Sequence, residues 1–124
     1  MIRLLGLRSA WRRVTAAHEG SVVYPTLIVR WPQSARRIRT AIVAFVVDST
    51  GISLRDRGDR EVLLLRSDGI LSIELAPLTR SAFRPLRVTT IDHGEIDLAI
   101  SQLRPDDQVD VVVAVRTALG RPVG

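Results

Sequence analysis

Three side chains that can bind metal ions or transfer protons stand together near the C-terminal third of the chain. Asp92, His93 and Glu95 fall within four consecutive positions, and carboxylates and imidazole are common metal ligands and acid–base groups. A metal site would need ligands from elsewhere, and the only other histidine is His18. Because Gly94 can adopt positive φ and aspartate can cap a turn, the sequence predicts a hairpin tip here and not a site. Across this hairpin, Ile91 is expected to face Ile96.

A basic group offers a different chemistry. Arginines occur at positions 30, 36, 37 and 39, the last three inside a polar stretch. Guanidinium groups match phosphate oxygens in pairs, and a loop allows several of them to converge. Arg30, Arg36, Arg37 and Arg39 are therefore the candidate site for an anion or a lipid headgroup. The alternative is a solvated basic loop. All 18 basic residues of the chain are arginine, so the abundance of arginine in this stretch can reflect the overall composition of the chain.

The net charge is unevenly distributed. Residues 1–40 hold eight arginines and one acid, a net charge of +7, whereas residues 41–124 hold ten arginines and twelve acids, a net charge of −2. A basic region on a mildly acidic body favours a polyanionic partner, either an anionic lipid surface or an acidic protein. Nucleic acid is a weaker candidate, because only 4% of the residues are aromatic and no base-stacking motif is present.

The first eighteen residues have the pattern of an amphipathic helix. Apolar residues recur at spacings of three and four, which places them on one stripe that ends at His18, and arginines fall on the other side. Such a helix can pack on its own domain, contact a partner, lie in a membrane interface or serve as a targeting presequence. The predicted membrane or partner contacts are Leu4, Leu7, Arg8, Trp11, Arg12, Arg13 and Val14.

After residue 20, short apolar stretches alternate with turn signals, which is typical of an antiparallel β-domain. "DSTG" (48–51), "RDRGDR" (55–60) and "RSDG" (66–69) are predicted turns, and 76–85 is a longer connection. Seven strands are expected, over 21–31, 40–47, 52–54, 61–65, 70–75, 86–91 and 95–100.

The end of the chain favours a helix over 106–119. Acids follow Pro105, Arg116 stands in the expected last turn, and Gly120 occupies the position of a helix-terminating glycine. Val109, Val112, Val113 and Leu119 are expected to share its apolar face. The run of valines leaves a strand as the alternative.

Seven antiparallel strands followed by one helix resemble a bacterial pleckstrin-homology-like (PH-like) domain. The resemblance rests on "AFVVDSTGISLRD", "LRVTTIDHGEIDLAI" and "RPDDQVDVVVAVRTALG" and covers about residues 21–120. It implies a mostly β, α+β fold: a seven-stranded barrel or sandwich closed by a C-terminal helix. The domain would span 21–124, preceded by the N-terminal amphipathic helix of 1–20. In membrane-binding members of that family, basic residues beside the first loop hold phosphoinositide headgroups. The arrangement of Arg30, Arg37 and Arg39 resembles that of these basic residues.

These patterns together predict a non-catalytic binding module that contacts an anionic membrane surface or an acidic partner. The alternative is a protein–protein interaction subunit or homo-oligomer with no role in lipid binding. The chain has no cysteine, no Gly-rich phosphate loop and no Ser/His/Asp pattern, so no catalytic residue, metal or cofactor is predicted. The longest apolar run, 41–47, is too short to span a membrane. The expected location is cytoplasmic, with peripheral attachment to the inner face of the membrane.

Overall fold

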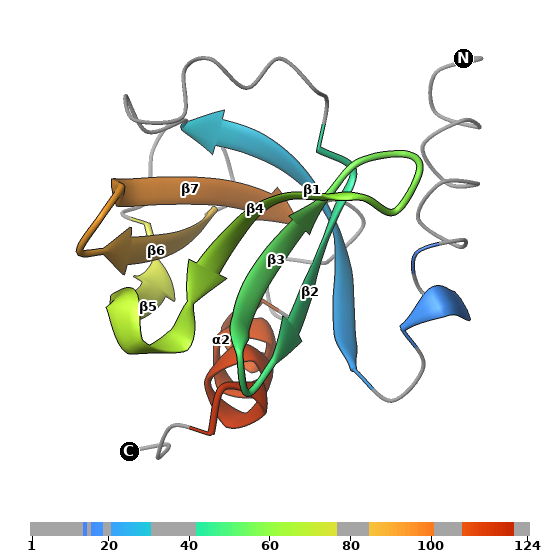
Figure 1. Ribbon diagram of the computed structural model, residues 1–124. Coiled ribbons are helices and arrows are strands. Elements are labelled where there is room, and N and C mark those ends of the chain that lie inside the picture. Colours follow the sequence, from blue (N-terminus) through green and yellow to red (C-terminus); the bar gives the residue numbers. More distant parts are fainter. Residues whose placement is uncertain are drawn as a thin grey trace.

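The computed structural model describes residues 14, 16–18, 21–30, 42–76, 85–100 and 108–120. Within these ranges, strands are followed by one long helix at the C-terminal side (Figure 1). In chain order the elements are β1 (Val22–Arg30), β2 (Ala44–Asp48), β3 (Gly51–Arg55), β4 (Glu61–Arg66), the 3-10 turn η2 (Ser67–Gly69), β5 (Ile70–Leu75), β6 (Leu86–Thr90), β7 (Gly94–Ile100) and α2 (Gln108–Ala118).

Strand β1 belongs to two antiparallel sheets. Its first half, Val22–Pro25, pairs with β2, and its second half pairs with β7 from Thr26 onward. The strand order is β4-β3-β2-β1-β7-β6-β5. We call β1–β4 sheet A and β5–β7 sheet B. In the part of the chain that the structure describes, no ladder joins β4 to β5, so the two sheets form an open sandwich and the predicted barrel does not close.

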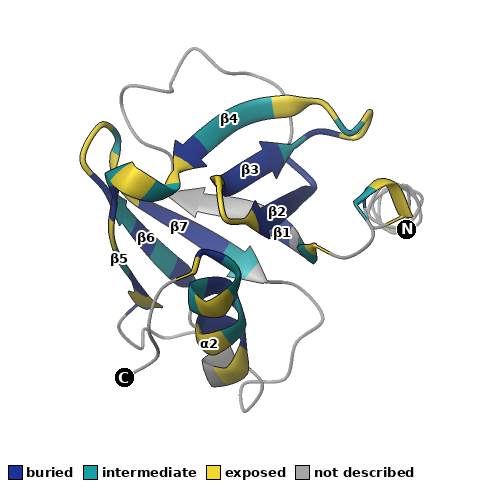
Figure 2. Cartoon of the chain, turned by 60° about the horizontal axis from the view of Figure 1, so that its bottom comes forward, coloured by how far each residue is buried: buried dark blue, intermediate teal, exposed yellow. Residues whose placement is uncertain are grey.

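The core lies between the sheets and α2. On β2, Phe45 and Val47 point into it, and on β3 so do Ile52 and Leu54, which follows from the two-residue period of a strand. Sheet B contributes alternate residues of β6 and β7 in the same way. Figure 2 shows the buried strands of both sheets converging above α2.

Helix α2 covers the core with one face. Val111, Val115 and Leu119 are buried at spacings of four, as an amphipathic helix requires. Val113 is exposed, which corrects the predicted apolar face: a position two residues after Val111 points away from it. Gly120 has a φ of 77° and donates its N–H to Thr117 O, so the predicted helix stop is confirmed.

The coarse architecture predicted from the sequence is confirmed: a mostly β domain with seven antiparallel strands and a C-terminal helix. The strand alternative for 106–119 is wrong, since Gln108–Ala118 is helical. The predicted N-terminal helix lies outside the described residues, apart from Val14 and 16–18, where His18 N–H donates to Val14 O at 3.1 Å. None of the helices described is long and apolar enough to cross a membrane.

Candidate functional site

The loop between β3 and β4 is built around a buried carboxylate. Asp56 is only 5% exposed. Its Oδ1 accepts the backbone N–H groups of Gly58 and Arg60, each at 2.9 Å, and the backbone N–H of Asp56 donates to Arg60 O at 3.1 Å. At a turn the backbone N–H groups have no partner strand. An aspartate side chain that accepts hydrogen bonds from backbone N–H groups a few residues ahead satisfies them instead. The predicted turn at "RDRGDR" is thereby confirmed, with Asp56 as its organising residue.

These hydrogen bonds change the acidity of the group. The backbone N–H of Arg60 is the largest cause that lowers the pKa of Asp56 below its ordinary value of 3.8, and the N–H of Gly58 and the Arg60 guanidinium act in the same direction. Burial of the carboxylate opposes them. Asp56 is therefore an ionised structural group with no capacity to take up a proton near neutral pH.

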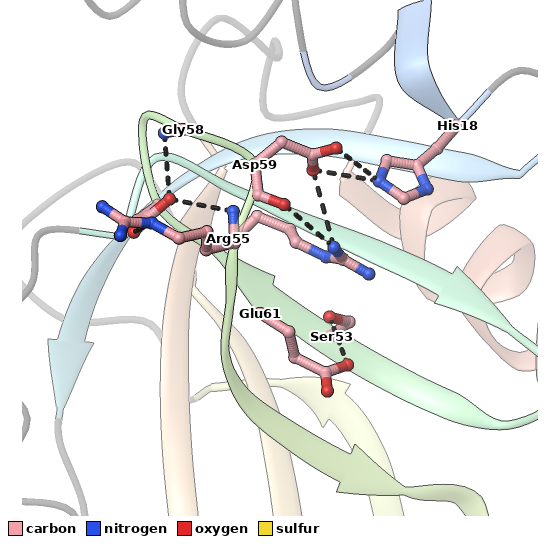
Figure 3. A network of polar contacts seen from close by, with 8 residues as sticks. His18, Ser53, Arg55, Gly58, Asp59 and Glu61 are labelled. Atoms are coloured by element: carbon pink, nitrogen blue, oxygen red, sulfur yellow. Dashed lines mark hydrogen bonds and ion pairs between the residues drawn. The ribbon is translucent and has the colours of Figure 1, made fainter.

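A second carboxylate of the same loop reaches across to the N-terminal side of the chain. Asp59 Oδ1 and Oδ2 lie 2.9 and 3.0 Å from His18 Nε2. Arg55 Nη1 donates to the backbone carbonyl of Asp59 at 3.1 Å and lies 3.7 Å from its Oδ1. Figure 3 shows Asp59 held between the imidazole and the guanidinium. Because the carboxylate only accepts hydrogen bonds, Nε2 of His18 carries the proton in this contact.

Basic side chains of this loop face solvent. Arg57 is exposed, and the side chain of Arg60 is 83% exposed even though its Nε lies 3.3 Å from Asp56 Oδ2. The chain that follows residues 31–41 rejoins sheet A beside this loop, because Val43 N–H donates to Arg55 O at 2.9 Å. Residues 42 and 43, which lead into β2, therefore lie beside the β3–β4 loop at one end of sheet A.

Among the predicted anion-binding residues, only Arg30 lies in a described segment. It is the last residue of β1, and its Cα pairs with Asp97 of β7 after a register shift. Nothing is described of its side chain. Arg36, Arg37 and Arg39 lie outside the described residues, so this site stays a prediction.

Of the predicted membrane or partner contacts, Val14 is described, and it is fully buried. It packs with Val43, Ala44 and Val46, with Val23 alongside; we call this group the outer cluster. Ala44 and Val46 alternate with core residues of β2, so the outer cluster lies on the face of sheet A that is turned away from α2. Leu4, Leu7, Arg8, Trp11, Arg12 and Arg13 lie outside the described residues.

The tip of the β6–β7 hairpin is a turn, as predicted. Thr90 Oγ1 accepts the backbone N–H of His93 at 3.0 Å and donates to Gly94 O at 3.2 Å, and Gly94 has a φ of 71°. The predicted pairing of Ile91 with Ile96 is wrong: Ile96 pairs with Val88, and Ile91 lies in the turn. The strand ends earlier because a turn that needs the Thr90 hydroxyl must start at Thr90.

An open cleft of about 300 Å³ lies beside this hairpin, between η2 and the tip, with Arg66, Asp68, Asp92 and His93 on its walls. Across the described residues, no group of three or more His, Cys, Asp or Glu side chains is arranged to hold a metal ion. The cleft therefore brings charged groups together without a set of described side chains arranged to hold a metal ion.

Sequence reasoning missed the contact between His18 and Asp59 and the exposed side chains of Arg57 and Arg60 on the β3–β4 loop. The arginines of "RDRGDR" were visible as charges, but the stretch was interpreted only as a turn. The pairing of residues 41 positions apart has no local sequence signal.

No known family model matches the chain, and no curated protein sequence is significantly similar to it.

Proposed function

We propose that this protein is a non-catalytic binding module related to PH-like domains, and that it binds an anionic membrane surface through its basic N-terminal third. The observation that carries the proposal is the separation of charge: +7 in residues 1–40 against −2 in the rest. Anionic lipids attract clustered arginines to a degree that falls as salt rises. The fold is consistent with this, since PH-like domains are described by the same count of strands and the same closing helix.

The position of the β3–β4 loop supports the proposal further. Val43, just before β2, lies next to Arg55, and the exposed Arg57 and Arg60 follow on the same loop. Acids of this loop do not cancel the attraction fully, because Asp56 is turned inward onto backbone N–H groups and Asp59 is engaged with His18. The exposed guanidinium groups of Arg57 and Arg60 match the phosphate groups of lipid heads.

Co-sedimentation of the full chain with vesicles tests the proposal. We expect binding to vesicles that contain anionic lipid, weaker binding at high salt and none to purely zwitterionic vesicles. Replacement Arg37→Ala should weaken binding about fivefold, since each basic residue near such a surface contributes about 1 kcal/mol.

The matched control is Arg66→Ala, which removes the same charge. Arg66 ends β4 at the other end of the strand from the β3–β4 loop and faces Asp68 at 3.5 Å. Equal losses for the two variants would show that only net charge matters. Absence of binding to anionic vesicles at low salt would reject the lipid proposal.

A second candidate function is a protein-interaction subunit or homo-oligomer, and two exposed apolar residues favour it. Leu71 is 60% and Ile91 65% exposed, and Ile91 N–H donates to Gly69 O, so both lie at one end of sheet B. Light scattering distinguishes the two candidates: a stable assembly that Leu71→Ser together with Ile91→Ser dissociates, without vesicle binding, would favour this second function.

A further inference from the structure

The last turn of the N-terminal segment contacts the domain at two points on one face. Val14 is fully buried in the outer cluster, and His18 contacts Asp59. The two residues are four positions apart and joined by the hydrogen bond from His18 N–H to Val14 O, so a helical turn places both on the same side. Between them, Ala16 and Ala17 are exposed. The face that bears Val14 and His18 is therefore turned toward sheet A.

The polar contact is held in place from the domain side. Asp59 has a φ of 58°, a left-handed conformation that its loop maintains through the hydrogen bond from Asp59 N–H to Asp56 O at 3.1 Å. Arg55 anchors the backbone carbonyl of Asp59. The side chains of His18 and Asp59 are only 23% and 19% exposed, so water competes weakly for the contact. Asp56 and Arg60 form a separate charged pair in the same loop.

The same face is the one that a membrane interface would take up. The sequence pattern predicts that Leu4, Leu7, Trp11, Val14 and His18 share one stripe of a helix. An interfacial helix inserts its apolar stripe between lipid chains. Val14 cannot be in the outer cluster and in a bilayer at the same time, so docking on sheet A and insertion exclude each other.

We propose that the contact of Val14 and His18 with sheet A is an autoinhibitory clasp, which must open before the N-terminal segment can insert its apolar face into an anionic membrane. The proposal rests on the proposed lipid-binding function and adds a regulatory step to it. The apparent affinity for the membrane then equals the affinity of the open form multiplied by the fraction of molecules that are open. Weakening the clasp therefore tightens membrane binding.

Asp59→Gly tests the clasp. Glycine tolerates the φ of 58° and keeps the backbone carbonyl that Arg55 contacts, while the carboxylate that holds His18 is removed. The matched control is Asp92→Gly on the β6–β7 hairpin, which removes an exposed acid and changes the net charge equally. His18→Ala opens the clasp from the other side without changing the charge of the neutral form, and His93→Ala is its control.

Two measurements on each full-length variant separate the possible results. Amide hydrogen exchange of residues 14–23 and of β2 reports the clasp without any lipid, and co-sedimentation with anionic vesicles reports binding. We expect Asp59→Gly and His18→Ala each to speed exchange about tenfold and to tighten vesicle binding about tenfold, the effect of losing one hydrogen bond to a charged group. The double variant should add little, because both changes remove one contact.

Four results would overturn the proposal. Unchanged exchange in Asp59→Gly would show that the His18 contact does not hold the segment. Faster exchange, with vesicle binding no tighter than that of Asp92→Gly, would show a clasp that inhibits nothing. If the wild-type chain and every variant fail to bind anionic vesicles, the proposed function is rejected, and autoinhibition with it. If all of them bind equally well, only the clasp is rejected.

Discussion

The β3–β4 and β6–β7 hairpins have similar residue types at their tips but different roles in the molecule. "RDRGDR" and "IDHGE" both combine acids with a glycine. In the first, Asp56 is buried under backbone N–H groups and Asp59 contacts a residue 41 positions away. In the second, the hydroxyl of Thr90 makes hydrogen bonds over three or four positions, Ile91 N–H donates to Gly69 O, and Asp92 is exposed.

The difference shows what decides the role of an acidic turn residue. An aspartate that points inward must be satisfied by donors in the protein, because burial removes its water. At the β3–β4 tip the donors are the N–H groups of the loop itself, so the acid becomes part of the fold. At the β6–β7 tip a neutral hydroxyl closes the turn and leaves Asp92 in solvent, where it contributes little to stability.

The largest expected effect is on the buried carboxylate of the first hairpin. Asp56→Ala leaves the N–H groups of Gly58 and Arg60 without their acceptor, which should lower the free energy of unfolding by about 3 kcal/mol. Asp92→Ala, at the exposed position of the second hairpin, should change it by less than about 0.5 kcal/mol. Urea denaturation monitored by circular dichroism measures both. Equal effects of the two variants would show that the two tips do not differ in the way described.

The acidity of Asp56 gives the comparison a dependence on pH. A carboxylate whose pKa is lowered by folding stabilises the native state above the unfolded value of 3.8 and loses that contribution as pH falls through its folded value. The wild-type chain should therefore lose stability below about pH 4, and Asp56→Asn should lose less over the same range. Denaturation midpoints between pH 6 and 2 test this. Identical slopes for Asp56→Asn and wild type would assign the acid sensitivity to other carboxylates.

Sequence reasoning succeeded where the physical cause is local. The apolar run at 40–47 predicted a strand where β2 lies, Gly94 and Asp92 marked a hairpin tip, and Gly120 marked the end of α2. Each depends on backbone conformation or on neighbours within four residues. Val113 was assigned to the wrong face of the helix, because in a run of valines the residue types alone do not indicate which one points outward.

The candidate site could be predicted only as a set of charges. That Asp56 turns inward, whereas Asp92 does not, depends on how each loop closes in three dimensions. His18 and Asp59 are 41 positions apart in the sequence, and their contact depends on the pairing of β1, β2 and β3, which brings them together. Neither residue carries a signal of the other in the sequence, so this part required the structure.

The glycines of the two tips should also respond differently to a methyl group. Gly94 has a φ of 71°, so Gly94→Ala should cost about 1 kcal/mol from the left-handed backbone alone, since no atom lies within 4 Å of the added Cβ. A Cβ at Gly58 would make ordinary contacts of 3.5 Å with Asp56 Oδ1 and 3.6 Å with Arg60 Nε. Gly58→Ala should therefore be neutral within about 0.5 kcal/mol. Thermal denaturation of the two variants compares them, and a larger loss at Gly58 would contradict the geometry of the first loop.

A further small effect concerns the hydroxyl that closes the second tip. Thr90→Val keeps the shape of the side chain and removes the bonds to the His93 N–H and the Gly94 carbonyl, so the free energy of unfolding should fall by about 1 kcal/mol or less, because His93 and Gly94 lie near solvent. The free energy of local opening, measured by amide exchange at His93, should fall more than the global free energy of unfolding, because an isolated turn can open without the sheet. The control is Thr89→Val, on the opposite face of β6, where no such turn depends on the hydroxyl. If Thr90→Val instead cost as much as Asp56→Ala, the second tip would be as strongly coupled to the fold as the first, and the contrast between a structural acid and a solvated one would no longer explain the two hairpins.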